Sequence, residues 1–289
     1  MKGIDVSSYQ GNVDWNKVKR NGIEFAILKV IRKDGSPDKQ FENNYKGASD
    51  AGIIIQGVYN YSYATTIEKA KMDAKKVVSI LGERKPFVWL DVEDNCQKNL
   101  GQNLIDIILS YQKIIKANNM DFGVYTGLSF YNTYIKPYYS QIKDIPFWIA
   151  RYYKGYSSFK VSDSVNAIYK PSIKNKMYGW QYTSSGIVNG INGACDVNIW
   201  YQNIEKKDDK ELTNQTILRY GDSGENVKMM QQRLLAKNFK TCIIDGQKKK
   251  LVADGKFGPI TKSILVRFKI YSGLSDEPIC DAATWRNLF

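Results

Sequence analysis

The sequence predicts an α/β fold: an irregular β/α barrel of the TIM type, followed by a second, small helical domain. Three observations lead there. Short β-branched and aromatic runs alternate with helical patterns over the first two-thirds, a charged polar segment follows, and amphipathic helical patterns then restart. A chain of 289 residues also exceeds the roughly 100–200 residues of one typical domain.

The strand-like runs of the first part are separated by helical patterns, which predicts parallel strands. Helices are expected at residues 40–51, 67–81 and 103–118, where apolar residues recur at helical spacing. Little helix lies between the last runs, so the later crossovers are expected to lack theirs. About eight strands result, and eight is the number that closes a β/α barrel: residues 3–7, 25–31, 53–62, 87–93, 122–126, 146–152, 177–184 and 195–201.

Domain boundaries follow from composition. Residues 1–203 form the predicted barrel, and residues 204–216 are charged and polar without apolar periodicity, which is typical of a solvated linker. Residues 217–289 form the predicted small domain. Its two expected helices are marked by apolar residues at helical spacing, namely Val227, Met230, Leu234 and Leu235, then Ile264, Leu265, Phe268 and Tyr271.

Histidine is absent from the chain, which argues against Ser-His-Asp and Cys-His catalysis and against His-rich zinc sites. Acid and base must then come from other side chains, mainly Asp and Glu. The four cysteines lack CxxC spacing and are expected to be free, partly buried thiols: Cys96, Cys195, Cys242 and Cys280. Neither a metal nor a cofactor is expected.

A net charge of +13 indicates an anionic partner or surface, without choosing among nucleic acid, acidic lipid and anionic polymers. No nucleic-acid-binding motif appears, so nucleic acid is not expected. Membrane insertion is not expected either, because no apolar run approaches the ~20 residues of a span. The first residues lack the pattern of a secretion signal, so we expect export, if any, by another route.

Acidic residues stand at or near the C-terminal ends of the predicted strands: Asp5, Asp91, Glu93 and Asp196. In a β/α barrel those ends meet on the active-site face. Asp91 and Glu93 are two positions apart, so on one strand they point to the same face, about 6.6–6.8 Å apart along the backbone. Two such carboxyl groups can flank one glycosidic bond, as in retaining and inverting glycosidases. This spacing alone does not decide the stereochemistry.

Two other interpretations of these acids stay open. Single Asp and Glu residues are usually ion-paired surface groups, and clusters of carboxylates also bind Mg²⁺ or Ca²⁺. An acid pair pointing into a barrel carries like charges, which raise one pKa, so catalysis is the preferred hypothesis.

Aromatic residues are abundant at the same strand ends. Flat rings stack on sugars and hydroxyl groups supply hydrogen bonds, which suits a glycan cleft. The alternative for any one ring is core filling. We expect Tyr61 and Tyr125 above all to bind substrate, together with Tyr63, Trp148 and Trp180; Tyr59, Trp89 and Tyr182 belong to the same group of rings.

The motifs GIDVSSYQG, WLDVE, FGVYTG and CDVN, in this order, resemble the family 25 glycoside hydrolases, the muramidases of phage endolysins and bacterial autolysins. The resemblance covers about residues 1–202. It implies cleavage of the β-1,4 bond between N-acetylmuramic acid and N-acetylglucosamine, with Glu93 as general acid, Asp91 as its partner, and Asp5 and Asp196 lining the cleft. Asp91 is either the nucleophile or the group that orients the substrate's acetamido group. A chitinase-type DxxDxDxE motif fails, because Pro86 and Trp89 stand where it needs Asp.

The tail resembles the small helical peptidoglycan-binding domain, in LRYGDSGENV, in DGKFGPIT and in the final TWRNL. It departs at DEPICDAATW, where the family more often has a Gly-containing turn. The resemblance implies a cell-wall-binding role for residues 217–289, with peptidoglycan as partner and anionic wall polymers as a further partner class.

Together these features predict an endolysin-type lysozyme that stays in the cytoplasm of a bacterial host and reaches the wall after the membrane is permeabilised. Two alternatives stay open: a bacterial autolysin of the same chemistry acting outside the cell, and a non-catalytic wall-binding protein.

Overall fold

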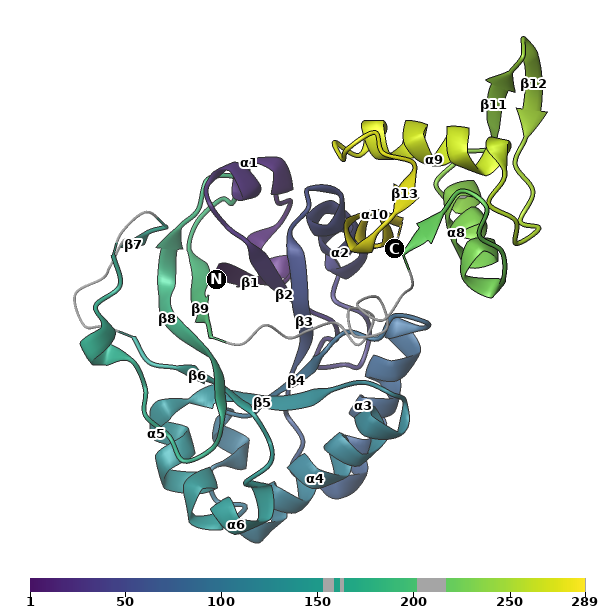
Figure 1. Cartoon of the computed structure of the whole chain (residues 1–289). Coiled ribbons are helices and arrows are strands. Elements are labelled where there is room, and N and C mark those ends of the chain that lie inside the picture. Colours follow the sequence, from purple (N-terminus) through teal and green to yellow (C-terminus); the bar gives the residue numbers. More distant parts are fainter. Residues whose placement is uncertain (153–158, 162–163, 202–216, 289) are drawn as a thin grey trace. The chain divides into compact units, whose positions relative to one another are not determined.

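The computed structural model describes residues 1–152, 159–161, 164–201 and 217–288 (Figure 1). The chain divides into two compact units, Met1–Ile204 and Glu205–Phe289. The predicted linker 204–216 lies outside the described residues. Among the described residues, no helix is both long and apolar enough to cross a membrane.

Unit 1 is a closed barrel of eight strands, with the confirmed α/β order of strands and helices. Hydrogen bonding runs β1 to β6 in sequence order, then β6–β8, β8–β9 and β9–β1. The strands are β1 (Lys2–Val6), β2 (Phe25–Lys29), β3 (Ile54–Tyr61), β4 (Val88–Asp91), β5 (Phe122–Gly127), β6 (Phe147–Ala150), β8 (Met177–Ile187) and β9 (Cys195–Trp200). A short β7 (Phe159–Lys160) pairs with the end of β8.

The strands are not all parallel. β9 runs antiparallel to both β8 and β1. Since only seven residues separate β8 from β9, no helical crossover fits between them, and a short connection joins antiparallel neighbours. This connection explains why the later crossovers have lost their helices.

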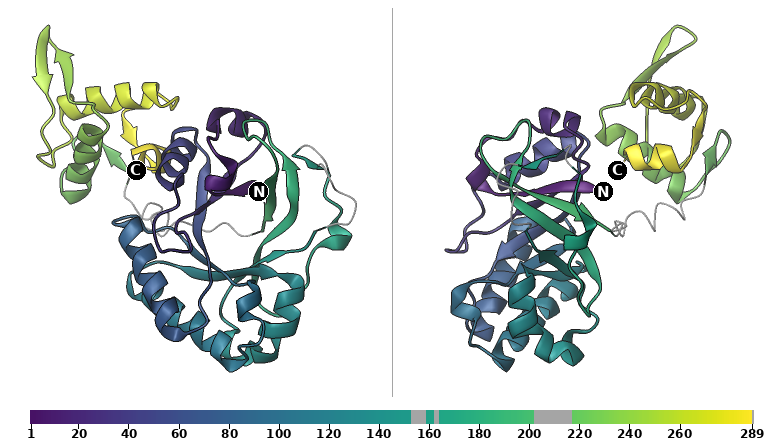
Figure 2. Two further views of the ribbon diagram at one scale, coloured as in Figure 1. Left: turned by 180° about the vertical axis from the view of Figure 1, so that it is seen from behind. Right: turned by 90° about the vertical axis from the view of Figure 1, so that its left-hand side faces the viewer.

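Helices lie on the outside of the barrel beside the strands up to β6 (Figure 2). α2 (Phe41–Asp50), α3 (Ile67–Leu81) and α4 (Gln102–Ala117) confirm the three predicted helices to within two residues. Their buried faces pack on the outward side chains of the strands in one large apolar core. The shorter elements are η1 (Ser8–Gln10), α1 (Trp15–Arg20), η2 (Asn95–Gln97), α5 (Leu128–Phe130), η3 (Tyr131–Ile135), η4 (Lys136–Tyr138), α6 (Tyr139–Ile142) and η5 (Ala167–Tyr169).

The barrel interior is filled by large aromatic rings beside glycines. A Cβ on Gly123 would lie 2.3 Å from the Trp89 ring, and one on Gly179 would lie 2.1 Å from the Trp200 ring. These two tryptophans and Trp148 are at most 3% exposed. Side chains therefore close the barrel below its carboxyl ends, so any cleft must lie at those ends.

Unit 2 holds α8 (Glu225–Ala236), α9 (Pro259–Tyr271) and α10 (Ala282–Leu288) around their own apolar core. Two antiparallel strand pairs accompany them: β10 (Leu218–Arg219) with β13 (Ile279–Cys280), and β11 (Thr241–Ile244) with β12 (Gln247–Lys250). Both predicted helices form.

Two features of unit 2 correct the sequence-based description. Tyr271, expected on the apolar face of α9, is 82% exposed. The unit is also not purely helical, because β11 and β12 form a hairpin. The two residues of its loop, Asp245 and Gly246, both have positive φ. An Asp-Gly pair between two strands is among the strongest signals of a hairpin in a sequence.

Candidate active site

Asp5 and Asp196 face each other across the β1–β9 ladder, where they are direct register partners. A hydrogen bond joins the two carboxyl groups, which requires one of them to carry a proton. Burial raises the pKa of both, and the charge on Asp5 raises that of Asp196 further. The pKa of Asp5 is about 6 and that of Asp196 about 9, so at neutral pH the proton belongs to Asp196.

Asp5 stays ionised more easily because two buried amides donate to it. Its Oδ2 accepts hydrogen bonds from Asn198 Nδ2 at 2.7 Å and Gln181 Nε2 at 2.9 Å. Both bonds lower the pKa of Asp5 against the effect of burial. The hydroxyl groups of Tyr125 and Tyr152 donate to Gln181 Oε1 at 2.8 and 2.6 Å, which holds that amide in place.

Asp91 ends β4 and lies level with Tyr61 on β3 and Tyr125 on β5. It is 5% exposed, and its Oδ1 atom is buried without a hydrogen-bond partner. Burial, then the charge on Glu93, raises the pKa of Asp91 well above its ordinary value. Lys29 acts in the opposite direction and favours the charged carboxylate.

Glu93 follows β4 by two residues and is only partly buried. Burial raises its pKa, and the charges on Asp5 and Asp94 add to the effect. Glycine at position 127 leaves room beside it, since a Cβ there would lie 3.8 Å from Glu93 Oε2. Of the four predicted acids, Glu93 lines a cavity of about 600 Å³.

That cavity is formed where the chain leaves three neighbouring strands. Besides Glu93 after β4, its wall comes from the end of β5 with α5, from η3, and from the end of β6. The lining residues are Glu93, Gly127, Leu128, Ser129, Asn132, Thr133, Ala150, Arg151 and Tyr152. An acid with a raised pKa therefore stands at the wall of a space that can admit a substrate.

Tyr61 and Tyr63 lie on the other side of the acids and remain partly exposed. Their ring centroids are 4.9 Å apart, and Tyr61 donates a hydrogen bond of 3.1 Å to Asp94. Lys33 Nζ lies 4.3 Å from the Tyr63 ring centroid. Tyr125 is 5% exposed, among the acids at the end of β5. These positions are compatible with the predicted sugar contacts of Tyr61, Tyr63 and Tyr125, which stay predictions.

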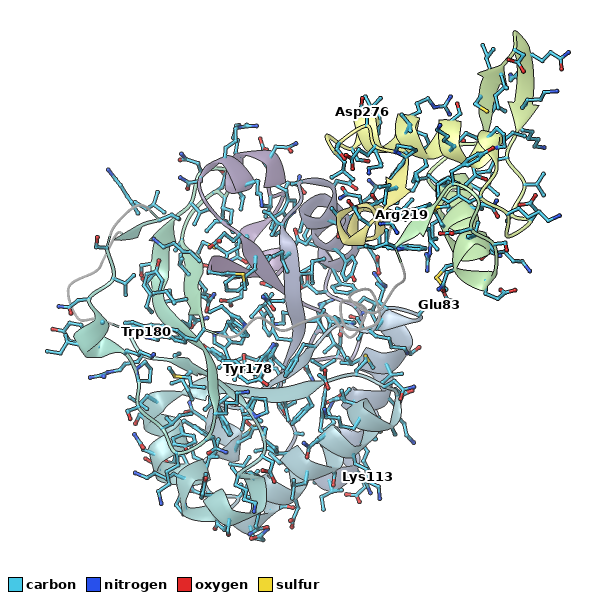
Figure 3. The ribbon with its side chains drawn as sticks, viewed as in Figure 1. Glu83, Lys113, Tyr178, Trp180, Arg219 and Asp276 are labelled. Carbon is cyan, nitrogen blue, oxygen red and sulfur yellow. The ribbon has the colours of Figure 1, made fainter. Side chains whose placement is uncertain are left out.

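The predicted substrate contacts of Trp180 and Trp148 are wrong. Trp180 lies on the face of β8 opposite to Gln181 and packs in the outer core, where its Nε1 donates to the Arg151 carbonyl at 2.8 Å (Figure 3). Trp148 does point inward, but it is 1% exposed and its Nε1 donates to Asn198 at 2.8 Å. Strand alternation directs one ring away from the site and buries the other beneath it.

Several site residues were missed from sequence. Asn198 lies two positions after Asp196, so the two-residue strand period already placed it on the same face. Gln181 is a polar residue between two aromatics in a strand, which is a weaker signal. Lys29, Tyr152 and Arg151 carry no local signal, because only barrel closure brings their strands to the acids.

The arrangement concentrates four carboxyl groups in a space with few compensating charges. Such a cluster holds protons at neutral pH and can deliver one to a bound substrate. Among the described residues, no three Asp, Glu or Cys side chains are placed to hold a metal ion. The four carboxyl groups offer proton transfer and charge stabilisation.

Comparison with known proteins decides the family. A sequence profile described as "Glycosyl hydrolases family 25" matches residues 4–191, about two-thirds of the chain. The chain belongs to family 25 of the glycosyl hydrolases.

This family 25 hydrolase is similar to "Autolytic lysozyme" of Clostridium acetobutylicum, with 29% identity over 95% of this chain and 74% of that protein. Its fold is similar to that of a bacterial lysozyme from Streptomyces coelicolor, with 25% identity, a TM-score of 0.56, and coverage of 71% of this chain and 93% of that one. It is also similar to the modular autolysin LytC from Streptococcus pneumoniae in complex with a synthetic peptidoglycan ligand, with 27% identity, a TM-score of 0.58, and coverage of 69% of this chain and 46% of that one.

Proposed function

We propose that this hydrolase is a lysozyme that cleaves the β-1,4 bond between N-acetylmuramic acid and N-acetylglucosamine in peptidoglycan, with Glu93 as its general acid. The observation that carries the assignment is the position of Glu93, at the wall of the cavity with a raised pKa beside three further acids. The lysozyme and autolysin names of its relatives support the reaction and the substrate.

In this mechanism Glu93 holds a proton in the resting site and donates it to the oxygen of the leaving sugar. Positive charge then develops at the anomeric carbon. Asp91 stabilises that charge as a carboxylate, a form that burial opposes, that the nearby Lys29 favours, and that a protonated, uncharged Glu93 no longer opposes. Asp91 does so either by bonding to the anomeric carbon as nucleophile or by orienting the acetamido group of the substrate for attack. Water, deprotonated by Glu93 acting now as base, then attacks the anomeric carbon and displaces the group bonded to it. Two displacements therefore retain the anomeric configuration in both routes.

Asp5 and Asp196 complete the electrostatic environment. The proton held by Asp196 removes one negative charge from the cluster, and Asp5 is held by Asn198 and Gln181. We assign both residues to positioning and charge balance in the cleft. Neither lines the cavity beside Glu93.

A reducing-end assay on purified peptidoglycan tests the function. An enzyme releases new sugar ends, and borohydride reduction followed by hydrolysis identifies the sugar at each end. Muramic acid at the new ends is the expected result, and NMR of the freshly released ends, recorded before reduction, should show retained configuration. New glucosamine ends would contradict the bond assignment, inverted configuration would contradict both routes for Asp91, and no new ends would favour the non-catalytic wall-binding alternative.

For residues 217–289 we propose a wall-binding role. The outward face of the β11–β12 hairpin carries Lys248 and Lys250 beside Ile243, which is 73% exposed. Cations on an exposed ribbon attract anionic wall polymers, and an apolar neighbour adds contact area. Sedimentation of the protein with purified walls, with and without Lys248→Gln and Lys250→Gln, measures the contribution of this face.

For the biological setting we keep the phage endolysin proposal, with the autolysin as the second candidate. Similarity to an autolytic lysozyme over 95% of the chain supports the autolysin candidate. The two differ in where the protein is found before lysis. An endolysin remains with the cells until the membrane is permeabilised, whereas an autolysin is recovered from the walls or medium of growing cells.

A further inference from the structure

The cavity beside Glu93 contains polar groups that the mechanism does not use. Its wall carries the hydroxyl groups of Ser129 and Thr133, the amide of Asn132 and the guanidinium of Arg151. Arg151 is the cation among the residues that line it. A space of about 600 Å³ also lies within the range of small-ligand sites, and it is larger than proton transfer requires.

The backbone of Arg151 is fixed independently of its side chain. Its N–H donates to the Gln181 carbonyl at 3.1 Å, and its carbonyl accepts from Trp180 Nε1 at 2.8 Å. The end of β6 therefore keeps its place in the barrel when the side chain at position 151 changes. This makes Arg151 suitable for substitution.

The guanidinium itself is held weakly. One nitrogen lies 3.5 Å from the Lys170 carbonyl, at the limit of a hydrogen bond, and its carbon lies 5.9 Å from the Tyr169 ring centroid. Within the part of the chain that the structure describes, no carboxylate lies within 4.0 Å of it. Arg151 thus keeps hydrogen-bond donors for an anion, and arginine can bind a carboxylate through two parallel bonds.

The two sugars of peptidoglycan differ in one substituent, the lactyl ether on O3 of the muramoyl unit. That group ends in a carboxylate on bare glycan strands and in an amide to the stem peptide on peptide-bearing strands. An enzyme that cleaves only one of the two alternating linkages must recognise this substituent close to the scissile bond. Glu93 marks the scissile bond and lines the same cavity as Arg151.

We propose that this cavity binds the carboxylate-bearing substituent of the muramoyl unit beside the scissile bond, with Arg151 as its specificity-determining residue. Ser129 and Asn132, which line the same cavity, supply further donors. The inference rests on the proposed muramidase function and deepens it. The carboxylate is that of the lactyl group or one of the stem peptide, and these sources are separated by experiment.

The test measures kcat and KM of the full-length wild-type protein and Arg151→Met on three soluble substrates. The first is peptide-bearing glycan strands, the second the same strands stripped of peptide by an amidase, and the third the stripped strands with the lactyl carboxylate converted to a methylamide. Arg151→Lys keeps the positive charge but lacks the two parallel N–H donors of the guanidinium group. Arg20→Met, at the exposed end of α1, removes the same charge elsewhere.

Arg151→Met should raise KM about ten- to hundredfold with little change in kcat, because a lost bond to a charged group away from the reacting atoms weakens ground-state and transition-state binding alike. If KM rises on the stripped strands alone, the carboxylate that Arg151 binds is that of the lactyl group. If KM rises on the peptide-bearing strands alone, it is a carboxylate of the stem peptide. Arg151→Lys should lie between, and Arg20→Met should match wild type.

The inference would be overturned if Arg151→Met raised KM on the methylamide strands as much as on the strands that carry a carboxylate. It would also be overturned if KM rose on none of the three substrates. Failure of the muramidase function is a separate result, because the wild-type protein would then release no muramic acid ends from any of the three substrates.

Discussion

At the scale of single residues, burial without enough partners explains the chemistry of the site. Asp91 Oδ1 is buried and unpaired, and Asp5 and Asp196 share one proton. Burial raises the pKa of Glu93, and the negative charges on Asp5 and Asp94 raise it further, so Glu93 keeps its proton to higher pH.

Glu93→Gln should abolish catalysis and leave the fold intact. The amide has nearly the same shape but cannot deliver a proton, and general acid catalysis contributes about 10²- to 10⁴-fold. Reducing-end release from purified walls measures the loss, and circular dichroism checks the fold. Exposed Glu83→Gln is the control (Figure 3). Residual activity within tenfold of wild type would contradict the assignment.

Because the pKa of Glu93 is raised, the wild-type rate should fall on the alkaline side as pH rises through that pKa. A rate that kept rising with pH would show that the essential acid is another group.

Asp196→Asn should make the barrel more stable at alkaline pH. A carboxyl group whose pKa is raised on folding contributes stability that is full below its unfolded pKa and is lost as pH rises through the folded pKa. For Asp196 that interval runs from about 4 to about 9. Asparagine does not ionise, so the variant does not lose the stability that ionisation of Asp196 costs the wild type. Its amide can still donate a hydrogen bond to Asp5.

Thermal unfolding of the wild type and Asp196→Asn between pH 5 and pH 8 measures the effect. Between pH 5 and pH 8, the free energy of unfolding of the variant should fall by about 1 to 3 kcal/mol less than that of the wild type. The basis is about 1.4 kcal/mol for each pH unit, reduced because Asp196 is coupled to Asp5 and is partly exposed. Asp144→Asn, at an exposed residue, is the control. Parallel curves for wild type and Asp196→Asn would show that Asp196 is ionised throughout.

At the scale of elements, strand alternation selects which residues reach the site. On β8, Gln181 points to the acids while Trp180 and Tyr182 pack in the outer core. Inside the barrel, glycines on β3, β5 and β8 make room for Trp89 and Trp200. These rings form the floor beneath the carboxylates.

Gly123→Ala should destabilise the barrel by about 1 to 3 kcal/mol, the usual range for overpacking. Its Cβ would lie 2.3 Å from the buried Trp89 ring, which has no free space to move into. Gly127→Ala is the matched control on the same strand, because its Cβ would meet only Glu93 Oε2 at 3.8 Å. Denaturant unfolding compares the two, and equal midpoints would contradict the packing argument.

At the scale of the whole molecule, the two compact units have separate apolar cores. No described residue of the acid cluster or of the cavity belongs to unit 2. The proposed bond cleavage can therefore be tested separately from the wall binding proposed for residues 217–289.

Residues 1–204 alone should fold and cleave soluble wall fragments at a rate close to that of the full-length protein. They should act more slowly on whole cells, and the difference should grow with salt. A tethered binding unit raises the local concentration of the barrel at the wall, whereas salt screens the general attraction of a cationic protein to anionic polymers. Melting and turnover of both proteins measure this. A truncated barrel that unfolds or loses soluble turnover would contradict independent units.

The sequence by itself determined the strand and helix order, the four acids at strand ends, and the helices of the second unit. These features depend on local periodicity, which each segment carries in its own residues. The DG loop of the hairpin was also readable and was overlooked.

Tertiary structure alone decided which side chains meet. Closure of β8 and β9 onto β6 and β1 brought Gln181, Asn198 and Arg151 to the acids, and alternation sent Trp180 outward. These contacts join residues as far apart as Asp5 and Asn198, which are 193 positions apart in the chain. No local pattern encodes such a contact, because it follows from how many strands close the barrel and in which register they pair.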